Sequence, residues 1–265
     1  MDCANLPCDL FYIQMNLYPE TEFPTDRRTL GRFFRRLRRK QPMLRHPRRT
    51  GPREWLIDME VQRGGQWCQV GRGRIGGGVL MPSSEREMLE MNIEILLAAT
   101  RILELRPVHC ASMEIVLAFE FLCHGNQPEL LVSALGLPPA METFCPYDGR
   151  VLHYMPTLTF AMQDDPRTQI RLHFETTSPV FGRSTLPFST EVGVDQNLLT
   201  VFLTLRRYLR DADGNSECGF RSVLERLFRT ACERVGDTLP DSVLRPLAER
   251  IAICETFFDP DADNP

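Results

Sequence analysis

Basic residues gather in one stretch near the start of the chain. Twelve of them, and no acidic residue, lie between positions 27 and 53. They are Arg27, Arg28, Arg32, Arg35, Arg36, Arg38, Arg39, Lys40, Arg45, Arg48, Arg49 and Arg53. The whole chain has a formal net charge of -4, so the remaining residues sum to -4 minus 12, or -16. Guanidinium groups stay charged and match the oxygens of phosphates and carboxylates. This density of positive charge therefore predicts a surface for phosphates, anionic lipid head groups or an acidic protein face.

A helix is expected to carry most of these arginines. The pair Thr25-Asp26 can cap a helix over residues 27–40, because its side chains accept hydrogen bonds from the first free backbone N–H groups. The apolar residues of this helix recur at the spacing of one face: Leu30, Phe33, Phe34 and Leu37. We expect that face to pack on a sheet and the arginines to point outward.

Three glycines further along the chain match the spacing of a dinucleotide-binding loop: Gly71, Gly73 and Gly76. A loop of that kind needs a helix that begins inside the motif, whereas residues 77–82 supply two more glycines and a proline first. We therefore interpret this stretch as the flexible or bulged exit of a hairpin. Arg72 and Arg74 lie between the glycines, where backbone N–H groups also attract anions, so both join the candidate nucleic-acid-binding residues.

The chain shows no sequence pattern for metal binding or nucleophilic catalysis. His109-Cys110 and Cys123-His124 resemble two halves of a zinc site, but the strand of 12 residues between them holds the pairs roughly 40 Å apart. No CxxC, HxxxH or GxSxG pattern occurs. His173 falls in the middle of a predicted strand, where we expect a half-exposed structural side chain. The catalytic residues are unknown, and we expect neither a metal nor a cofactor.

The composition is that of a folded protein. Of the 265 residues, 43% are apolar and 25% are charged, and no stretch approaches the roughly 18 apolar residues that cross a bilayer. The N-terminus lacks the pattern of a secretion signal, so we expect a cytoplasmic protein. The nine scattered cysteines are odd in number, and we interpret them as reduced, mostly buried thiols.

The order of the predicted elements indicates an α+β fold with a mainly antiparallel sheet. A strand over residues 9–17, the basic helix, a hairpin over 54–62 and 66–72, a capped helix to about residue 103, and a strand over 113–122 have the order of a ferredoxin-like split βαβ unit. A short helix, strands over 152–163, 168–177 and 198–208, and two helices over 220–235 and 241–257 follow. We divide the chain into halves, residues 1–125 and 126–265, which could also form one continuous domain.

From Trp55 onward, this layout resembles a sporadically distributed bacterial family of about this length whose function is uncharacterised. The shared features are the early strand and helix, the Trp-bearing hairpin, the long helix, the strand over residues 113–122, the segment 135–139, paired strands near Phe160 and Phe174, and a terminal strand followed by helices. The split βαβ order also resembles the RNA-binding proteins of CRISPR systems, which place a Gly-rich loop near RNA. In those proteins the loop lies late in the domain, whereas residues 71–78 lie early here.

Three functions are consistent with these features. The first is a non-enzymatic binding module that engages an anionic partner, nucleic acid before others, through the basic helix. The second is a protein–protein contact made by the same helix within an assembly, either with another protein or with a second copy of the chain. The third is an enzyme whose site is assembled from residues far apart in the sequence. Salt-dependent binding to nucleic acid separates the first function from the other two.

Overall fold

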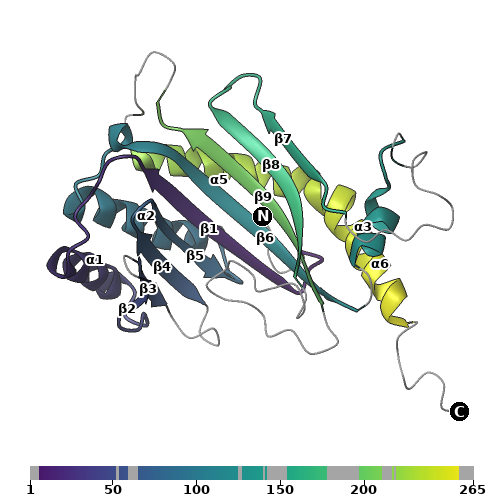
Figure 1. The fold of residues 1–265 in the computed structure, drawn as a ribbon, viewed down its shortest axis with the longest axis horizontal. Helices are drawn as coiled ribbons and strands as arrows, with labels where there is room; N and C mark the ends of the chain where they lie inside the picture. Colours follow the sequence, from purple (N-terminus) through teal and green to yellow (C-terminus); the bar gives the residue numbers. More distant parts are fainter. Residues whose placement is uncertain are drawn as a thin grey trace, which may run out of the picture.

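The structure of the protein is a computed structural model, which describes residues 6–51, 54–58, 65–124, 127–139, 141, 154–177, 197–210, 217 and 219–256. Nine strands in this part of the chain form one sheet. They are β1 (Leu10–Pro19), β2 (Arg48–Gly51), β3 (Glu54–Asp58), β4 (Gln66–Gly71), β5 (Arg74–Leu80), β6 (Cys110–Cys123), β7 (Thr157–Ala161), β8 (Thr168–Thr177) and β9 (Asn197–Tyr208). Their order across the sheet is β2-β3-β4-β5-β1-β6-β9-β8-β7, and each neighbouring pair is antiparallel (Figure 1). The predicted α+β class with a mainly antiparallel sheet is confirmed.

The sheet continues across the expected boundary between the two halves of the chain. β6 belongs to the first half and β9 to the second, and they pair through twelve residues from Ser112 opposite Tyr208 to Cys123 opposite Asn197. Within the first half, β1 lies between β5 and β6, and β5 lies between β4 and β1.

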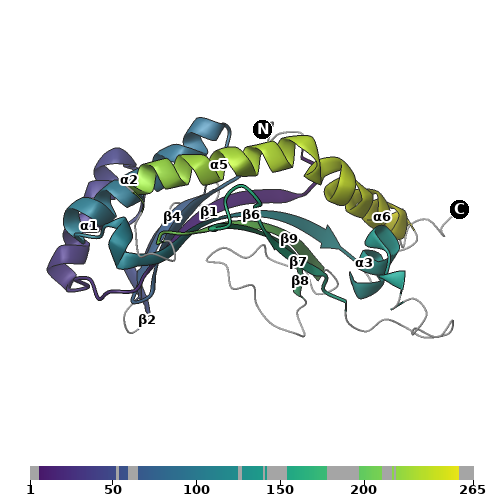
Figure 2. The same ribbon diagram turned by 90° about the horizontal axis from the view of Figure 1, so that it is seen from above.

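The described helices cover one face of this sheet. They are α1 (Arg27–Lys40), α2 (Glu85–Ile102), α3 (Gln127–Leu135), α5 (Phe220–Asp237) and α6 (Arg245–Thr256), with a 3-10 turn at Pro107–His109 and a π-helical turn at Pro240–Leu244 that leads into α6. Figure 2 shows the sheet bending so that the face opposite the helices is concave. We call this concave surface the open face. None of the described helices is long and apolar enough to cross a membrane.

The core lies between the sheet and the helices. In β1 the side chains of Phe11, Ile13, Met15 and Leu17 face this layer, and each is at most 1% exposed. The strand is also largely buried on its other side, where Tyr12, Gln14 and Asn16 lie. Side chains at even positions of β1 therefore lie on the open face.

The basic helix forms at the predicted residues. Asp26 caps it, because its Oδ1 atom accepts hydrogen bonds from the backbone N–H groups of Arg28 (3.0 Å) and Thr29 (2.9 Å). Its four predicted apolar residues are each at most 2% exposed. The expected buried face is thus confirmed, and it belongs to the same core as side chains of the sheet, with α2 lying next to α1.

The N-terminus of α2, which was expected to be capped, has a capping box in a shifted form. The Ser84 hydroxyl accepts from the backbone N–H of Glu87 (3.2 Å). The Glu87 carboxylate accepts in return from the backbone N–H of Ser83 (2.9 Å), one residue before the expected donor.

The Gly-rich stretch was wrongly interpreted as a flexible hairpin exit, because it forms β5 in the middle of the sheet. A Cβ atom on Gly77 would collide with Ile95 and would lie 2.9 Å from the carbonyl oxygen of Trp67. One on Gly78 would collide with the carbonyl oxygen of Ile13 and lie 2.6 Å from the Trp67 ring. These glycines let β4, β1 and α2 approach β5 more closely than any side chain allows.

Two further elements differ from expectation. The Pro- and Arg-rich connector after α1 contains β2, a short strand that pairs with β3 at the edge of the sheet. β7 is shorter than the strand expected over residues 152–163, part of which lies outside the described residues.

Candidate functional site

The most exposed arginines of α1 form a stripe along the helix. At about 100° per residue, Arg28, Arg32, Arg35 and Arg39 fall within roughly 60° of one another, on the side opposite the buried apolar residues. All four residues are exposed. We call these four residues the α1 stripe. Within the described part of the chain, no hydrogen bond or ion pair engages their side chains.

A shallow hollow of about 320 Å³ lies beside this stripe. Its lining is almost entirely cationic and consists of Arg32, Arg35, Arg36, Arg39, Lys40 and Ile102. Arg36 is the member with a described carboxylate partner, since its guanidinium lies 3.5 Å from Glu94 of α2. The positive charge of the other members is uncompensated by the described residues, so the hollow is suited to an anion.

Several other predicted binding residues are engaged in holding their own segment. Arg38 donates to the carbonyl oxygen of Leu44 (3.2 Å), and Arg48 forms an ion pair with the nearly buried Asp58 (2.6 Å). The Nε atom of Arg49 donates to a backbone carbonyl two residues on (2.8 Å). These contacts fix the chain between α1 and β3 and leave fewer donors for a ligand.

The structure places the remaining predicted residues apart from one another. Arg27, Lys40 and Arg45 are exposed at the two ends of α1 and just beyond it, while Arg53 lies outside the described residues. Arg72 is in the turn between β4 and β5 and pairs with Glu22 (3.1 Å), and both side chains are exposed. Arg74 lies on the open face, where it donates to Gln69 (2.9 Å). The structure therefore groups the α1 residues and separates Arg74 from them.

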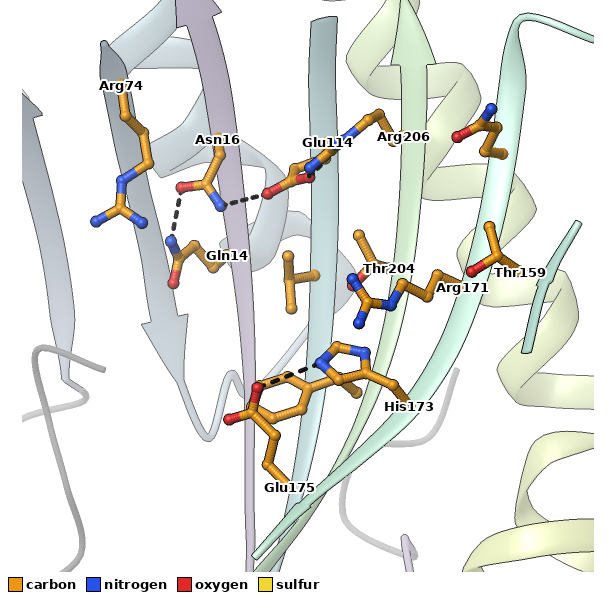
Figure 3. A pocket seen from close by; sticks show the side chains of 13 residues that line it. Gln14, Asn16, Arg74, Glu114, Thr159, Arg171, His173, Glu175, Thr204 and Arg206 are labelled. Atoms are coloured by element: carbon orange, nitrogen blue, oxygen red, sulfur yellow. Dashed lines mark hydrogen bonds and ion pairs between the residues drawn. The ribbon is translucent and has the colours of Figure 1, made fainter. Parts of the chain in front are cut away.

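A second group of polar side chains lies in the concave open face. It surrounds a cavity of about 350 Å³, which we call the open-face cavity (Figure 3). Six neighbouring strands, from β5 to β7, contribute to its wall. The lining residues are Gln14, Asn16, Arg74, Glu114, Val116, Thr159, Gln169, Arg171, His173, Glu175, Phe202, Thr204 and Arg206.

Glu114 is the centre of the hydrogen-bond network in this cavity. Its side chain is 6% exposed and accepts two bonds from Arg206, at 2.9 and 2.6 Å. It also accepts from the amide of Asn16 (3.0 Å) and from the hydroxyl of Tyr18. Gln14 extends the chain of bonds by donating to Asn16 (2.6 Å). A buried carboxylate with this many donors is fully compensated, so its role is to hold β1, β6 and β9 together.

Tyr18 and Arg206, which both bind Glu114, also contact each other. The guanidinium of Arg206 lies 5.3 Å from the centre of the Tyr18 ring, within the range of a cation–π contact. Burial and the neighbouring Glu114 carboxylate raise the pKa of Tyr18 above its ordinary value. Tyr18 therefore stays protonated and keeps donating its hydrogen bond.

His173 lies deeper in the cavity than a half-exposed strand residue would. Its side chain is 14% exposed, and its ring stacks on Phe202 with centroids 4.7 Å apart and planes 12° apart. The Nε2 atom lies 3.5 Å from the carboxylate of Glu175. The Nδ1 atom is buried and has no hydrogen-bond partner among the described residues.

Arg171 comes from the same strand as His173. Figure 3 shows both side chains projecting from β8 across β9 into the cavity. The direct cross-strand neighbours of Arg171 are Thr159 on β7 and Thr204 on β9. No described residue forms a hydrogen bond or an ion pair with the Arg171 side chain.

A buried arginine on the helix side of the sheet holds β8 and β9 together. Arg207 is 1% exposed, and its guanidinium binds Glu217 (2.8 and 2.6 Å), Thr168 (2.8 Å) and Asp165. Burial acts to raise the pKa of Asp165, but Thr168 and Arg207 outweigh it and hold that pKa below its usual value. This network anchors the turn before β8, the strand that carries Arg171 and His173.

Two of the described cysteines, Cys68 and Cys110, are not suited to nucleophilic chemistry. No disulfide bond joins the described cysteines, which are Cys8, Cys68, Cys110, Cys123, Cys232 and Cys254. Burial raises the pKa of Cys110 to about 12, and it raises that of Cys68 still further. Both thiols are therefore protonated at neutral pH. No group of three or more His, Cys, Asp or Glu side chains in the described ranges is arranged to hold a metal ion.

The sequence contains a pattern that corresponds to the open-face cavity. Every second residue of β8 in this region is polar or charged: Gln169, Arg171, His173 and Glu175. The same alternation occurs at Gln14 and Asn16 in β1 and at Thr204 and Arg206 in β9. Each pattern alone predicts a solvated strand face. That these faces adjoin depends on the order β1-β6-β9-β8, which the order along the chain does not reveal.

Comparisons with known proteins add no assignment. The chain has no significant match among protein-family models, curated proteins or solved structures. The function of the two sites must therefore be argued from their own chemistry.

Proposed function

We propose that this chain is a non-enzymatic module that binds nucleic acid through the α1 stripe. The observation that carries the proposal is the basic hollow beside α1, where Arg36 alone among the lining residues has a described carboxylate partner. The chain is otherwise acidic, so random solvation of its surface would not concentrate positive charge on one helix face.

The length of the stripe fits a phosphate backbone. Arg28 and Arg39 are eleven residues apart in the helix, which corresponds to about 16 Å at 1.5 Å per residue. One strand of a duplex presents a phosphate about every 3.4 Å along its axis, so roughly five phosphates lie within that span. Four arginines along 16 Å can each reach a different phosphate.

Contacts of this kind position a nucleic acid without reading its sequence. The stripe consists of charged groups alone, and the hollow adds one apolar side chain, Ile102. Phosphate contacts carry no direct information about base identity. We therefore propose binding with little sequence preference, to DNA or RNA.

The experiment is a comparison of three proteins in a fluorescence-anisotropy titration with labelled single- and double-stranded oligonucleotides. The first is the wild type and the second replaces all four arginines of the α1 stripe by Gln. The third replaces four exposed arginines elsewhere by Gln and so has the same net charge: Arg86, Arg221, Arg229 and Arg245. The proposal expects the stripe variant to lose affinity for every oligonucleotide alike, while the charge-matched control keeps it. Equal losses in the two variants, or no binding by the wild type at low salt, would exclude the proposal and leave α1 as a protein contact.

We also propose that residues 1–125 form a ferredoxin-like split βαβ unit with β2 and β3 added at its edge. Two β-α-β crossings support this assignment. The first crossing runs from β1 through α1 to β4, if the added strands β2 and β3 are left out, and β5 lies between β1 and β4 in the sheet. The second crossing runs from β5 through α2 to β6, and β1 lies between β5 and β6. An experimental structure in which β1 does not separate β5 from β6 would contradict it.

A further inference from the structure

We propose that the open-face cavity binds a small organic anion, whose carboxylate or phosphate group is held by Arg171 and His173. This site is separate from the α1 stripe, because α1 lies on the other side of the sheet (Figure 2). The proposal does not depend on the binding of nucleic acid.

The cavity has the size and composition of a small-molecule site. Its volume of about 350 Å³ lies at the lower end of the range for such pockets. Side chains from six strands converge on it, and Val116 and Phe202 provide an apolar part of the wall. A rigid sheet holds all of these groups, so the cavity does not have to be assembled from loops.

The internal charges of the cavity leave positive charge without a partner. Its wall carries three arginines and two glutamates. Arg206 is paired with Glu114, and Glu175 lies beside His173. Arg171 has no described partner. An anion that enters the cavity therefore meets a guanidinium that does not first have to break an ion pair.

Neighbouring groups extend the binding capacity of Arg171. Thr159 and Thr204 flank it directly on the adjacent strands, and their hydroxyls can donate to the same ligand. A guanidinium matches the two oxygens of a carboxylate or a phosphate in a bidentate arrangement. The geometry thus favours an anion with two equivalent oxygens over a halide.

His173 supplies an independent indication of a ligand. Its Nδ1 atom is buried without a partner among the residues that the structure describes, and an unsatisfied buried polar atom is unfavourable in a folded protein. Stacking on Phe202 and the contact with Glu175 fix the ring, so this nitrogen cannot turn away easily. A ligand that displaces the atoms now covering Nδ1 and hydrogen-bonds to it would satisfy it.

The test is a calorimetric titration of the full chain with three probes: succinate, inorganic phosphate and chloride as the monatomic control. We expect saturable binding of succinate or phosphate and none of chloride at the same ionic strength. Preference for one probe identifies the anionic group of the ligand as a carboxylate or a phosphate. Arg171→Gln should weaken that binding by at least about tenfold, and His173→Phe, which retains a stacking ring, should also weaken it.

Two variants serve as controls. The first is Arg86→Gln, which changes an exposed arginine on α2, and the second is the fourfold Gln variant of the α1 stripe. Both should bind the probe as tightly as the wild type does. The proposal is overturned if neither succinate nor phosphate binds at about 10 mM or below, or if binding survives Arg171→Gln. It is also overturned if the α1-stripe variant abolishes binding, because the probes would then report on the basic helix. Circular dichroism of each variant ensures that loss of binding is compared between folded proteins.

Discussion

Replacing Arg207 by Met tests whether its ion-pair network holds the second half of the sheet. Arg207 is 2% exposed at its side chain, and it binds Asp165 in the turn before β8 and Glu217 after β9. The substitution keeps an unbranched side chain of similar length. It removes the positive charge and the five N–H donors of the guanidinium from a buried site. Two carboxylates then lose their main cationic partner.

The size of the effect follows from what remains. Removing one partner of a buried ion pair typically costs about 3–5 kcal/mol. Arg167 lies 3.1 Å from Glu217 and stays in place, and Asp165 is 24% exposed, so both carboxylates keep some compensation. We therefore expect a loss near the lower limit, about 3 kcal/mol, or a decrease in Tm of about 6–12 °C for a chain of this size.

Urea denaturation followed by circular dichroism measures this loss. Arg221→Gln is the control, because Arg221 pairs with Glu225 on the exposed surface of α5 and should contribute less than about 1 kcal/mol. Asp165→Asn should cost less in the Arg207→Met protein than in the wild type, since the two groups interact directly. A loss below about 1 kcal/mol for Arg207→Met would refute the reasoning that this buried network anchors β8.

Three further predictions concern the fold. Phe33→Asp places an unpaired charge on the buried apolar face of α1, so circular dichroism should show an unfolded protein; wild-type stability would mean that the assigned buried face of α1 is wrong. Gly77→Ala should lower the free energy of unfolding, measured by urea denaturation, by about 1–3 kcal/mol. The control Gly73→Ala should be nearly neutral, because a Cβ atom there meets nothing within 4 Å. Equal effects of the two substitutions would contradict the close packing of β5. The depressed pKa of Asp165 stabilises the fold above about pH 4, the usual aspartate value, and this contribution is lost as the pH falls through the lower folded value. The cost of Asp165→Asn measured by urea denaturation should therefore be larger at pH 7 than at pH 3, and a cost independent of pH would count against the ion pair.

The elements that were predicted correctly are those determined by interactions between residues close together in the sequence. The helix over residues 27–40 was recognisable because its cap and its apolar spacing both lie within a few neighbouring residues. The strand that became β6 was recognisable because β-forming residues fill it almost without interruption. The strand over residues 168–177 was also predicted at the bounds of β8.

The two misinterpreted features were missed for different reasons. Glycines usually interrupt strands, but those of β5 are required by Trp67 on the preceding strand, by Ile95 of α2 and by Ile13 of β1, which is far away in the sequence. The partner of the short strand β2 is local, because only residues 52 and 53 separate β2 from β3, but the sequence of β2 is rich in arginine and does not resemble a strand. The close approach of β1 to β5 therefore depends on a distant contact, whereas β2 was missed because of its composition.

The two sites also differ in how far apart their residues lie in the sequence. The α1 stripe arises from one helix, so its charge was visible as a run of residues. The open-face cavity combines single side chains of six strands, and the pairing of β6 with β9 brings its two sides together. Arg171 and Glu114 therefore did not stand out from other charged strand residues.

The slope of binding affinity against salt concentration tests the central claim most directly. If the four arginines of the α1 stripe contact phosphates, each releases condensed counterions, and log K should fall with log salt at a slope of about -3.6 on duplex and about -2.8 on single strands. The Gln variant of the α1 stripe should bring this slope close to zero, and the charge-matched control should retain it. A wild-type slope near zero, or one that the stripe variant leaves unchanged, would contradict the claim that α1 binds nucleic acid.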